Sequence, residues 1–185
     1  NEITSDVSIF LNDGTGNLGM PAQVALTAAG TPREIVVGDM NNDGFLDLVV
    51  TSPGVDEVSV LLNNQSGAFA DTAFATGVQP RGVSVADIDG DGFLDVVVAN
   101  FMDGTVSVLL NDQAGALLAP TSINVGMQPT GVTTADFDND GDQDVAVVLQ
   151  GDQMVQILTN TAGSLGVGAT VAVPVGSEDI EAGDL

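Results

Sequence analysis

The sequence predicts an all-β fold built from one repeated unit. An acidic segment recurs at intervals of 48 and 49 residues, with copies that begin at Asp39, Asp87 and Asp136. The apolar runs between these copies are short and rich in β-branched residues, as strands are. No stretch of the 185 residues keeps the 3.6-residue spacing of an amphipathic helix.

Each unit is expected to contain four short strands, which are easiest to see in the middle copy. Residues 82–86 alternate between apolar and polar, and residues 94–99 are nearly all apolar, which is typical of a strand buried on both faces. Residues 105–110 follow an Asp-Gly pair, a hairpin-turn signal, and form the third strand. A weaker strand at the sheet edge is expected at 117–125.

Incomplete units flank the three complete ones. Residues 7–11 and 22–28 match a third and a fourth strand, and residues 180–184 match a first strand. A unit of this length with four strands has the size of one propeller blade. We therefore predict a β-propeller of four-stranded antiparallel blades, with three complete blades and partial blades at both ends. The predicted units are 1–30, 31–78, 79–127, 128–176 and 177–185.

Two other repeat or sheet architectures compete with the propeller. The coils of a parallel β-helix are usually shorter than these units, and a β-sandwich would not need the repeat. Because the partial units lack one acidic segment and one strand, a ring closed by this chain would keep a gap of about 4.8 Å per missing strand. We therefore expect a piece of a longer propeller with seven or eight blades, with self-association through the open edges as the alternative.

The charge balance excludes several classes of partner. The chain has 26 acidic and 2 basic residues, a net charge of −24, so it repels nucleic acid and lacks a basic face for membranes. No apolar run approaches the roughly 18 residues of a membrane-spanning helix, so membrane insertion is not expected. Without Cys or His, thiol and imidazole chemistry is excluded. Carboxylate chemistry remains: either cation binding or general acid–base catalysis.

The three acidic segments, residues 39–47, 87–95 and 136–144, are called the first, second and third acidic loops. Each has oxygen-bearing side chains at positions 1, 3, 5 and 9 and glycine at position 6. Alternate residues of a tight loop can face one ion, and glycine supplies the positive φ that closes the loop. The loops hold 12 of the 26 acids, which repel one another unless a cation neutralises them. Such oxygen ligands favour Ca²⁺, with Mg²⁺ or Mn²⁺ as poorer alternatives.

An EF-hand loop begins in the same way but needs a glutamate at position 12 and flanking helices. Position 12 holds Val50, Val98 and Val147 in the three copies, and strand residues follow. The EF-hand therefore fails on two independent grounds.

The amino-acid sequence of the middle unit resembles the FG-GAP/VCBS repeats of integrin-α-like propellers. The resemblance rests on residues 79–87, the acidic loop, residues 94–100 and residues 106–111, and it extends over almost the whole chain. It implies that the backbone carbonyl at position 7 also binds the ion. The expected ligands of three Ca²⁺ ions are Asp39, Asn41, Asp43, Phe45 and Asp47; Asp87, Asp89, Asp91, Phe93 and Asp95; and Asp136, Asp138, Asp140, Asp142 and Asp144.

The resemblance also implies a function and a location. We expect a non-enzymatic module of a secreted or cell-surface protein, which serves adhesion or recognition of a protein or glycan ligand through the loops between blades. The metal is expected to staple the first two strands of each blade rather than to catalyse. A structural spacer and a propeller domain of a carbohydrate-active enzyme are the alternatives, although no His, Tyr or Lys is present as a base.

Both basic residues occupy the same position in the repeat. Arg33 and Arg81 lie six residues before the first loop aspartate, where the next units have Thr130 and Glu178. We expect each arginine to pair with carboxylates of its own or the next blade. The alternative is that they form part of an anion or ligand site near the propeller axis.

Overall fold

The computed structural model describes residues 5–10, 12, 14–27, 30–64 and 68–183. These residues form fourteen strands, and none of them lies in a helix. The described part of the chain accordingly offers no helix that could cross a membrane. The prediction of an all-β fold is confirmed.

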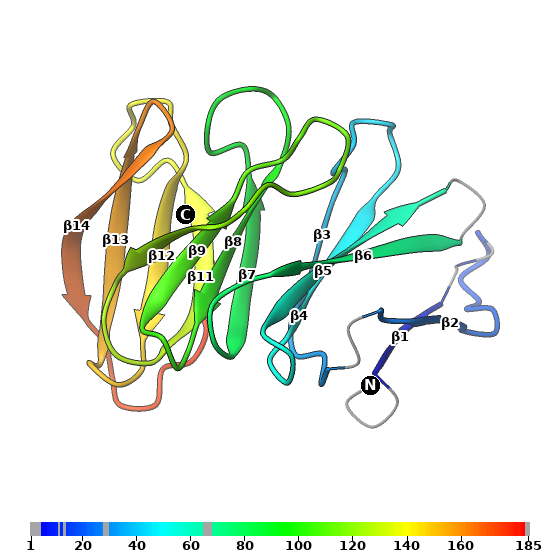
Figure 1. Cartoon of the computed structure of the whole chain (residues 1–185), viewed down its shortest axis with the longest axis horizontal. Helices are drawn as coiled ribbons and strands as arrows, with labels where there is room; N and C mark the ends of the chain where they lie inside the picture. The colour runs from blue at the N-terminus through cyan, green and yellow to red at the C-terminus, as the bar shows by residue number, and fades with distance from the viewer. Residues whose placement is uncertain (1–4, 11, 13, 28–29, 65–67, 184–185) are drawn as a thin grey trace.

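Three four-stranded antiparallel sheets follow one another along the chain, and in each the sequential strands are neighbours (Figure 1). The first sheet contains β3 (Ile35–Gly38), β4 (Asp47–Ser52), β5 (Glu57–Asn63) and β6 (Phe69–Ala75). The second contains β7 (Pro80–Ala86), β8 (Asp95–Asn100), β9 (Thr105–Leu109) and β10 (Thr121–Asn124). The third contains β11 (Pro129–Ala135), β12 (Asp144–Leu149), β13 (Met154–Thr161) and β14 (Ser164–Ala172). Each sheet lies within one of the units 31–78, 79–127 and 128–176.

The strands of the middle unit agree with the sequence prediction, with one change at the sheet edge. The weak strand expected at 117–125 is shorter, because only β10 pairs continuously with β9. Before it, Leu117 makes an isolated bridge to Asn111. Pro120 precedes β10 and has no N–H to donate, which fits the late start of the ladder.

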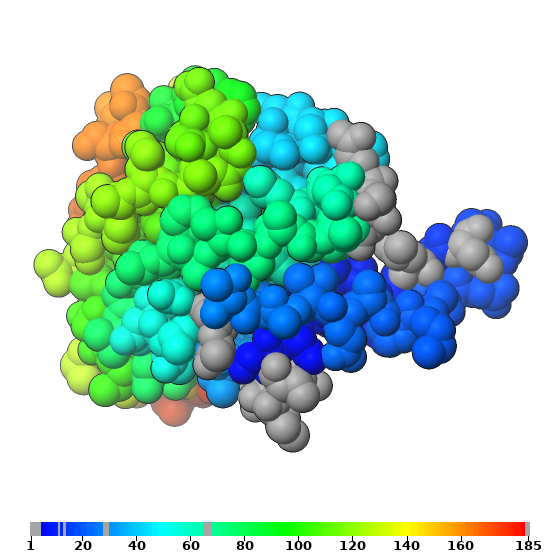
Figure 2. Space-filling model, turned by 45° about the vertical axis from the view of Figure 1, so that its right-hand side comes forward, coloured from blue at the N-terminus to red at the C-terminus, as the bar shows by residue number. Residues whose placement is uncertain are grey.

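The N-terminal partial unit forms a two-stranded sheet. Strands β1 (Asp6–Ile9) and β2 (Ala22–Ala25) pair in an antiparallel register, which confirms the third and fourth strands expected near the N-terminus; Leu11 and Ala28 lie outside the described residues. Side chains of this sheet pack against Val50 and Leu61 of the first sheet. Residues 14–20 between the two strands are exposed, and this segment projects from the side of the molecule (Figure 2, blue).

The first strand expected at 180–184 is wrong for the residues that the structure describes. Residues 173–183 contain no strand, and Asp184 lies outside the described part. A strand needs a hydrogen-bonded neighbour, and among the described residues none pairs with this segment. Val173 and Ile180 instead pack their side chains against Ala146, Val148 and Val155 of the third sheet.

The core lies between the sheets, and the second strand of each sheet is buried on both faces. Val96 and Val98 of β8 pack toward the first sheet, whereas Val97 and Ala99 pack toward the third. Alternate side chains of one strand point to opposite faces, so an unbroken apolar run serves two interfaces. This arrangement explains why residues 94–99 lack polar alternation.

Glycine allows the first strands of adjacent sheets to approach closely. A Cβ atom at Gly82 of β7 would overlap the Thr130 carbonyl oxygen of β11 and lie 3.0 Å from the Gly131 Cα. One at Gly131 would lie 2.8 Å from the Cα of Asp179. The backbones of residues 82, 131 and 179 therefore lie side by side, and only glycine fits at the first two positions.

Replacing Gly82 by alanine tests this close approach. We expect Gly82→Ala to lower the free energy of unfolding by about 1–3 kcal/mol, because β7 and β11 must separate to admit the methyl group. Gly166→Ala on β14 is the matched control, since the nearest atom to its Cβ is 3.9 Å away. Urea denaturation of both variants measures the difference, and equal midpoints would contradict the packing described.

Candidate metal centres

Each acidic loop connects the first and second strands of one sheet: β3 to β4, β7 to β8, and β11 to β12. The glycines at position 6, Gly44, Gly92 and Gly141, have φ values of 88°, 90° and 100°. Their N–H groups donate to the Oδ2 atoms of the first aspartates over 2.8, 2.9 and 3.0 Å. The positive φ expected at this position is confirmed in all three loops.

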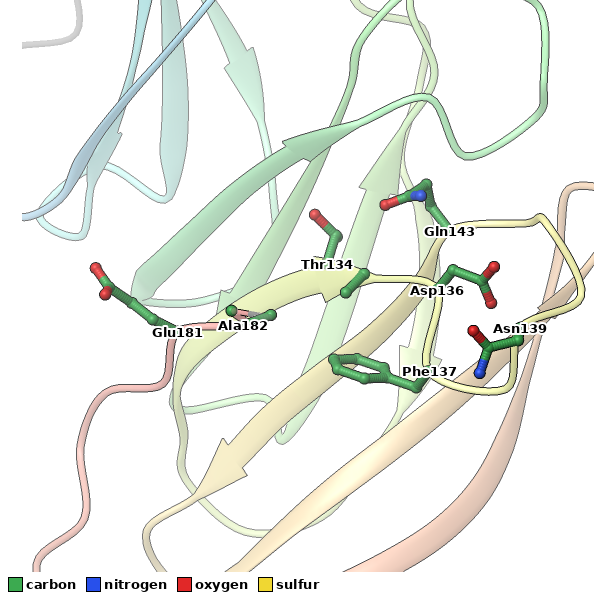
Figure 3. Close-up of a pocket in the computed structure, with 9 residues that line it drawn as sticks. Thr134, Asp136, Phe137, Asn139, Gln143, Glu181 and Ala182 are labelled. Carbon is green, nitrogen blue, oxygen red and sulfur yellow. The ribbon is translucent and has the colours of Figure 1, made fainter. Parts of the chain in front are cut away.

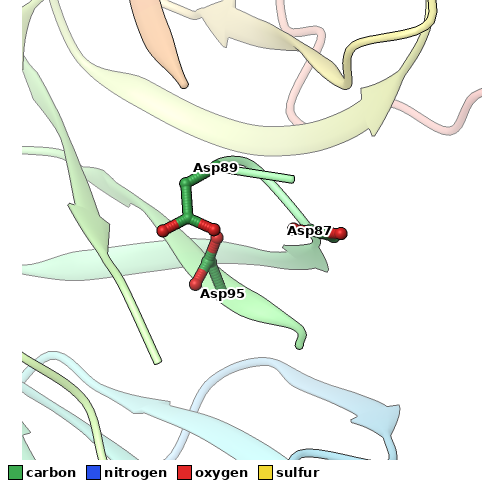
Figure 4. A group of neighbouring side chains, drawn as sticks. All are labelled: Asp87, Asp89 and Asp95. Atoms are coloured by element: carbon green, nitrogen blue, oxygen red, sulfur yellow. The ribbon is translucent and has the colours of Figure 1, made fainter. Parts of the chain in front are cut away.

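Two of the loops bring three carboxylates together. In the second loop, single oxygens of Asp87, Asp89 and Asp95 all lie within 4.8 Å of one another. Figure 4 shows the Asp89 and Asp95 carboxylates facing each other, with Asp87 to one side, where it follows β7. The third loop repeats the arrangement with the residues Asp136, Asp138 and Asp144. Two oxygens on one Ca²⁺ lie at most about 5 Å apart, so both triads fit a single ion of that size.

The first loop has asparagine where the others have the middle aspartate of the triad. The Asn41 Oδ1 atom accepts the Asp43 N–H over 3.1 Å. The Oδ1 atoms of Asp89 and Asp138 accept the corresponding N–H groups over 3.2 Å each. The amide oxygen therefore occupies the same place in the loop as the carboxylate oxygens, with one negative charge fewer.

The expected ligands at loop positions 5 and 7 are not part of the two carboxylate triads. The position 5 residues Asp43, Asp91 and Asp140 use their Oδ1 atoms to accept the N–H of position 7 over 2.9 Å, and Asp91 and Asp140 lie outside the two triads. At position 7 of the third loop, the Asp142 carboxylate accepts the Ala162 N–H over 2.7 Å. Coordination by the position 7 carbonyls of Phe45, Phe93 and Asp142 stays a prediction.

The ninth residue of each loop, Asp47, Asp95 or Asp144, is the first residue of the second strand and is buried. Its Oδ2 atom accepts the N–H of loop position 2 over 2.8–2.9 Å. Its Oδ1 atom accepts the N–H of an asparagine near the end of the third strand over 2.7–2.8 Å. Burial raises the pKa of Asp47 and Asp95, and these backbone hydrogen bonds oppose the rise. A bound cation would favour the ionised form further.

Two of those asparagines, Asn111 and Asn160, also connect neighbouring sheets. Asn111 Nδ2 donates to the Met40 carbonyl of the first loop over 2.7 Å and to the Leu94 carbonyl of its own unit over 2.9 Å. Asn160 Nδ2 repeats this pattern with the Ile88 and Gln143 carbonyls. The recurrence of Asn at the end of each third-strand motif was visible in the sequence, but its role was missed because the partner carbonyl belongs to another unit.

A cavity of about 790 Å³ lies beside the third loop, between that loop and residues 181–183. Figure 3 shows Phe137 and Asn139 of the loop on one side and Glu181 and Ala182 on the other. The corresponding faces of the first and second loops are covered by the following sheet, through Asn111 and Asn160.

The expected pairing of the arginines with carboxylates is wrong for the described residues. Within that part of the chain, neither guanidinium has a carboxylate at ion-pair distance. Arg81 instead places its guanidinium carbon 3.4 Å from the centre of the Phe101 ring. A cation–π contact therefore holds the side chain.

The family model described as FG-GAP-like repeat matches residues 2–50, 41–98 and 87–147. These matches span most of the chain, so the protein belongs to the FG-GAP-like repeat family. No curated protein is significantly similar to the chain.

Several solved structures share the fold. A functionally unknown protein from Desulfotomaculum acetoxidans DSM 771 is 14% identical, with a TM-score of 0.65 over 88% of this chain and 48% of its own. A Bacteroides uniformis ATCC 8492 protein, provisionally assigned as a 6-phosphogluconolactonase, is 15% identical, with a TM-score of 0.68 over 91% and 50%. An Agrocybe aegerita lectin that recognises non-reducing terminal N-acetylglucosamine is 20% identical, with a TM-score of 0.57 over 91% and 46%. The chain thus spans about half the length of these proteins.

Replacing Asn111 tests the connection between sheets. Asn111→Ala leaves the buried carbonyl of Met40 and the partly buried carbonyl of Leu94 without this donor, so we expect the free energy of unfolding to fall by about 2–4 kcal/mol. Asp112→Asn, in the exposed turn that follows, is the control and should change it by less than about 0.5 kcal/mol. Chemical denaturation followed by circular dichroism measures both, and an Asn111 variant as stable as the control would refute the connection.

Proposed function

We propose that the chain is a calcium-binding β-propeller module of a secreted or cell-surface protein, in which Ca²⁺ staples each blade and the module serves adhesion or ligand recognition. One observation carries the calcium part of the proposal. The same oxygen cluster recurs at the same place in successive sheets, between the first and second strands. Recurrence in matched register favours a metal loop over an acidic surface turn.

The packing of the first strands supports the propeller arrangement. Gly82 lies against Thr130 and Gly131, and Gly131 lies against Glu178 and Asp179, so equivalent positions of successive units meet. The sheets also pack face to face through shared apolar cores. Convergence of the first strands and stacking of the sheet faces are both features expected of propeller blades, and they support this part of the proposal.

The donor set supports calcium and a structural role for it. The ligands are carboxylate and amide oxygens, with no nitrogen or sulfur donor, which suits a hard cation with flexible coordination. An ion in each loop would hold the start of the second strand against the end of the first. It would also offset the repulsion among the aspartates of that loop.

Family membership and composition support the location and a non-enzymatic role. FG-GAP repeats typically occur in extracellular proteins, where Ca²⁺ sites of modest affinity are filled. Among the described residues, the groups of three closely spaced carboxylates lie in the acidic loops, and the chain has no His, Cys, Tyr or Lys to act as a base. Propeller folds host many activities, so the ligand has to come from experiment.

The partners that we propose are further blades of the same protein and a protein or glycan ligand. The cavity beside the third acidic loop is the face on which a following blade would pack, with self-association there as the alternative. The shared fold with an N-acetylglucosamine-recognising lectin makes a glycan array a reasonable first screen. A module that binds neither glycans nor cell-surface proteins in such screens would be a structural spacer.

Removing calcium tests the staple. We expect EGTA at neutral pH to lower the melting temperature, because each ion held well above its dissociation constant stabilises the folded chain by about 2–4 kcal/mol. Differential scanning calorimetry in Ca²⁺, in Mg²⁺ at the same concentration and in EGTA makes the comparison. An equal melting temperature with and without EGTA would contradict the calcium proposal. An equal increase in melting temperature with Mg²⁺ would contradict the preference for Ca²⁺.

Substitution at loop position 3 tests the sites one at a time. Asp89→Ala should remove one ion from the calorimetric stoichiometry. Asp89→Asn should keep the ion at lower affinity, because Asn41 fills the same position in the first loop. Asp112→Asn removes the same charge outside the loops and should leave the stoichiometry unchanged. Full ion binding by Asp89→Ala would exclude the second loop as a site.

A further inference from the structure

The two basic residues of the chain meet in one pocket. Arg33 and Arg81 line a pocket of about 190 Å³ together with Thr31, Pro53 and Gln79. Arg33 precedes β3, and Arg81 lies near the start of β7, so both are at the opposite end of the first strands from the acidic loops. In a chain with a net charge of −24, the only two cations thus face the same space.

A single buried threonine fixes the backbone of both arginines. The Thr51 carbonyl accepts the Arg33 N–H over 2.9 Å, and the Thr51 hydroxyl donates to the Arg81 carbonyl over 2.9 Å. The equivalent positions of the next two units hold Ala99 and Val148, which cannot make the second bond. This link therefore belongs only to the pair of sheets that carries the arginines.

Among the described residues, the guanidinium groups in the pocket lack hydrogen-bond partners, although a contact with the protein positions one of them. Phe101 holds the half-buried Arg81 guanidinium from one face. Across the described part of the chain, neither guanidinium donates a hydrogen bond to a protein atom. Each guanidinium carries five N–H donors in a planar fork, so the pocket presents an unusual concentration of free donors.

Nearby acids do not neutralise the pair. The Glu178 carboxylate accepts a hydrogen bond from Gln150 over 2.9 Å and is not at ion-pair distance from either guanidinium. Burial and the charge of Asp179 raise the pKa of Glu34 to about 7, so that carboxyl is only partly ionised at neutral pH. Burial and the neighbouring Arg33 lower the pKa of Arg81, whereas Glu178 raises it. The two arginines therefore repel each other without a protein counterion at ion-pair distance among the described residues.

We propose that this pocket binds the carboxylate group of a small ligand between Arg33 and Arg81. A guanidinium fork matches the two oxygens of a carboxylate, and an anion between the two forks would relieve their repulsion. The pocket is smaller than the 300 Å³ or so of a site that encloses a drug-sized molecule, so it fits a terminal group rather than a whole ligand. The strongly negative chain disfavours polyanions and favours a single charge.

The Arg Nε–Hε resonances give a direct assay, because the chain has two arginines and hence two such signals. At saturating Ca²⁺, the protein is titrated with sodium acetate, sodium glucuronate and N-acetylalanine, with glucose and NaCl as neutral and ionic-strength controls. We expect both signals to shift and to saturate together with the carboxylates and not with the controls. Tighter binding of glucuronate assigns an acidic sugar as the source of the carboxylate, and tighter binding of N-acetylalanine assigns a peptide C-terminus.

Arg33→Gln is the test variant, since Arg33 is exposed and its loss should not unfold the chain. We expect it to raise the dissociation constant reported by the Arg81 signal about tenfold or more. Gln153→Glu, in the turn between β12 and β13, makes the same change in net charge outside the pocket and should leave binding unchanged. Unsaturable shifts, equal shifts with NaCl, or unaltered binding by Arg33→Gln would each overturn the proposal.

The site does not rest on the calcium proposal. Repeating the titration in EGTA, with the fold checked by circular dichroism, separates the two. Carboxylate binding that persists when no calcium binding is detectable supports the pocket and counts only against the metal sites.

Discussion

The buried aspartate at the ninth position of each acidic loop is the group on which the rest of the repeat depends. Asp47, Asp95 and Asp144 are at most 1% exposed, yet each carries a carboxylate. A buried anion costs several kcal/mol unless its surroundings compensate it. Here both oxygens accept main-chain N–H groups, one from the loop and one from the end of the third strand. The carboxylate thereby joins three strands of a sheet at a single point, and a cation in the loop would complete its compensation.

The hydrogen bonds around the buried aspartate also link each sheet to its neighbour. In the second and third units, the asparagine that donates its main-chain N–H to the buried aspartate also uses its side chain to hold the loop of the preceding unit, as Asn111 does at Met40. The second-loop backbone also reaches the first loop, where Asn42 Nδ2 donates to the Gly92 carbonyl over 3.0 Å. Repeat proteins are stabilised by terms within units and between nearest neighbours, and these residues contribute to both. The acidic loops are therefore coupled in pairs rather than isolated on separate sheets.

Features that form within one repeat unit could be predicted from the sequence. Features that depend on contacts between two units could not. Periodicity and the repeat predicted the four strands of the middle unit, and the spacing of aspartates predicted a five-residue set in the second loop, three members of which, Asp87, Asp89 and Asp95, lie together. The role of Asn111 required knowing which loop faces it across a sheet interface. The strand expected at 180–184 is absent from its described residues because a strand exists only when a neighbour pairs with it. The arginines were expected to find carboxylates because acids are abundant, but abundance in sequence does not place an acid beside Arg81.

Distance along the first strands explains how one strongly acidic chain can offer both a cation site and an anion site. The acidic loops follow the first strands, whereas Arg33 and Arg81 lie near or before their beginnings. Six residues of extended chain separate Arg81 from Asp87, which is about 20 Å. The Debye length at physiological ionic strength is about 8 Å, so solvent screens most of the field of the loops at the arginine pocket. Within the pocket, the local pair of guanidinium groups then determines which ligand is favoured, and the net charge of the chain acts mainly on large polyanions that span both ends.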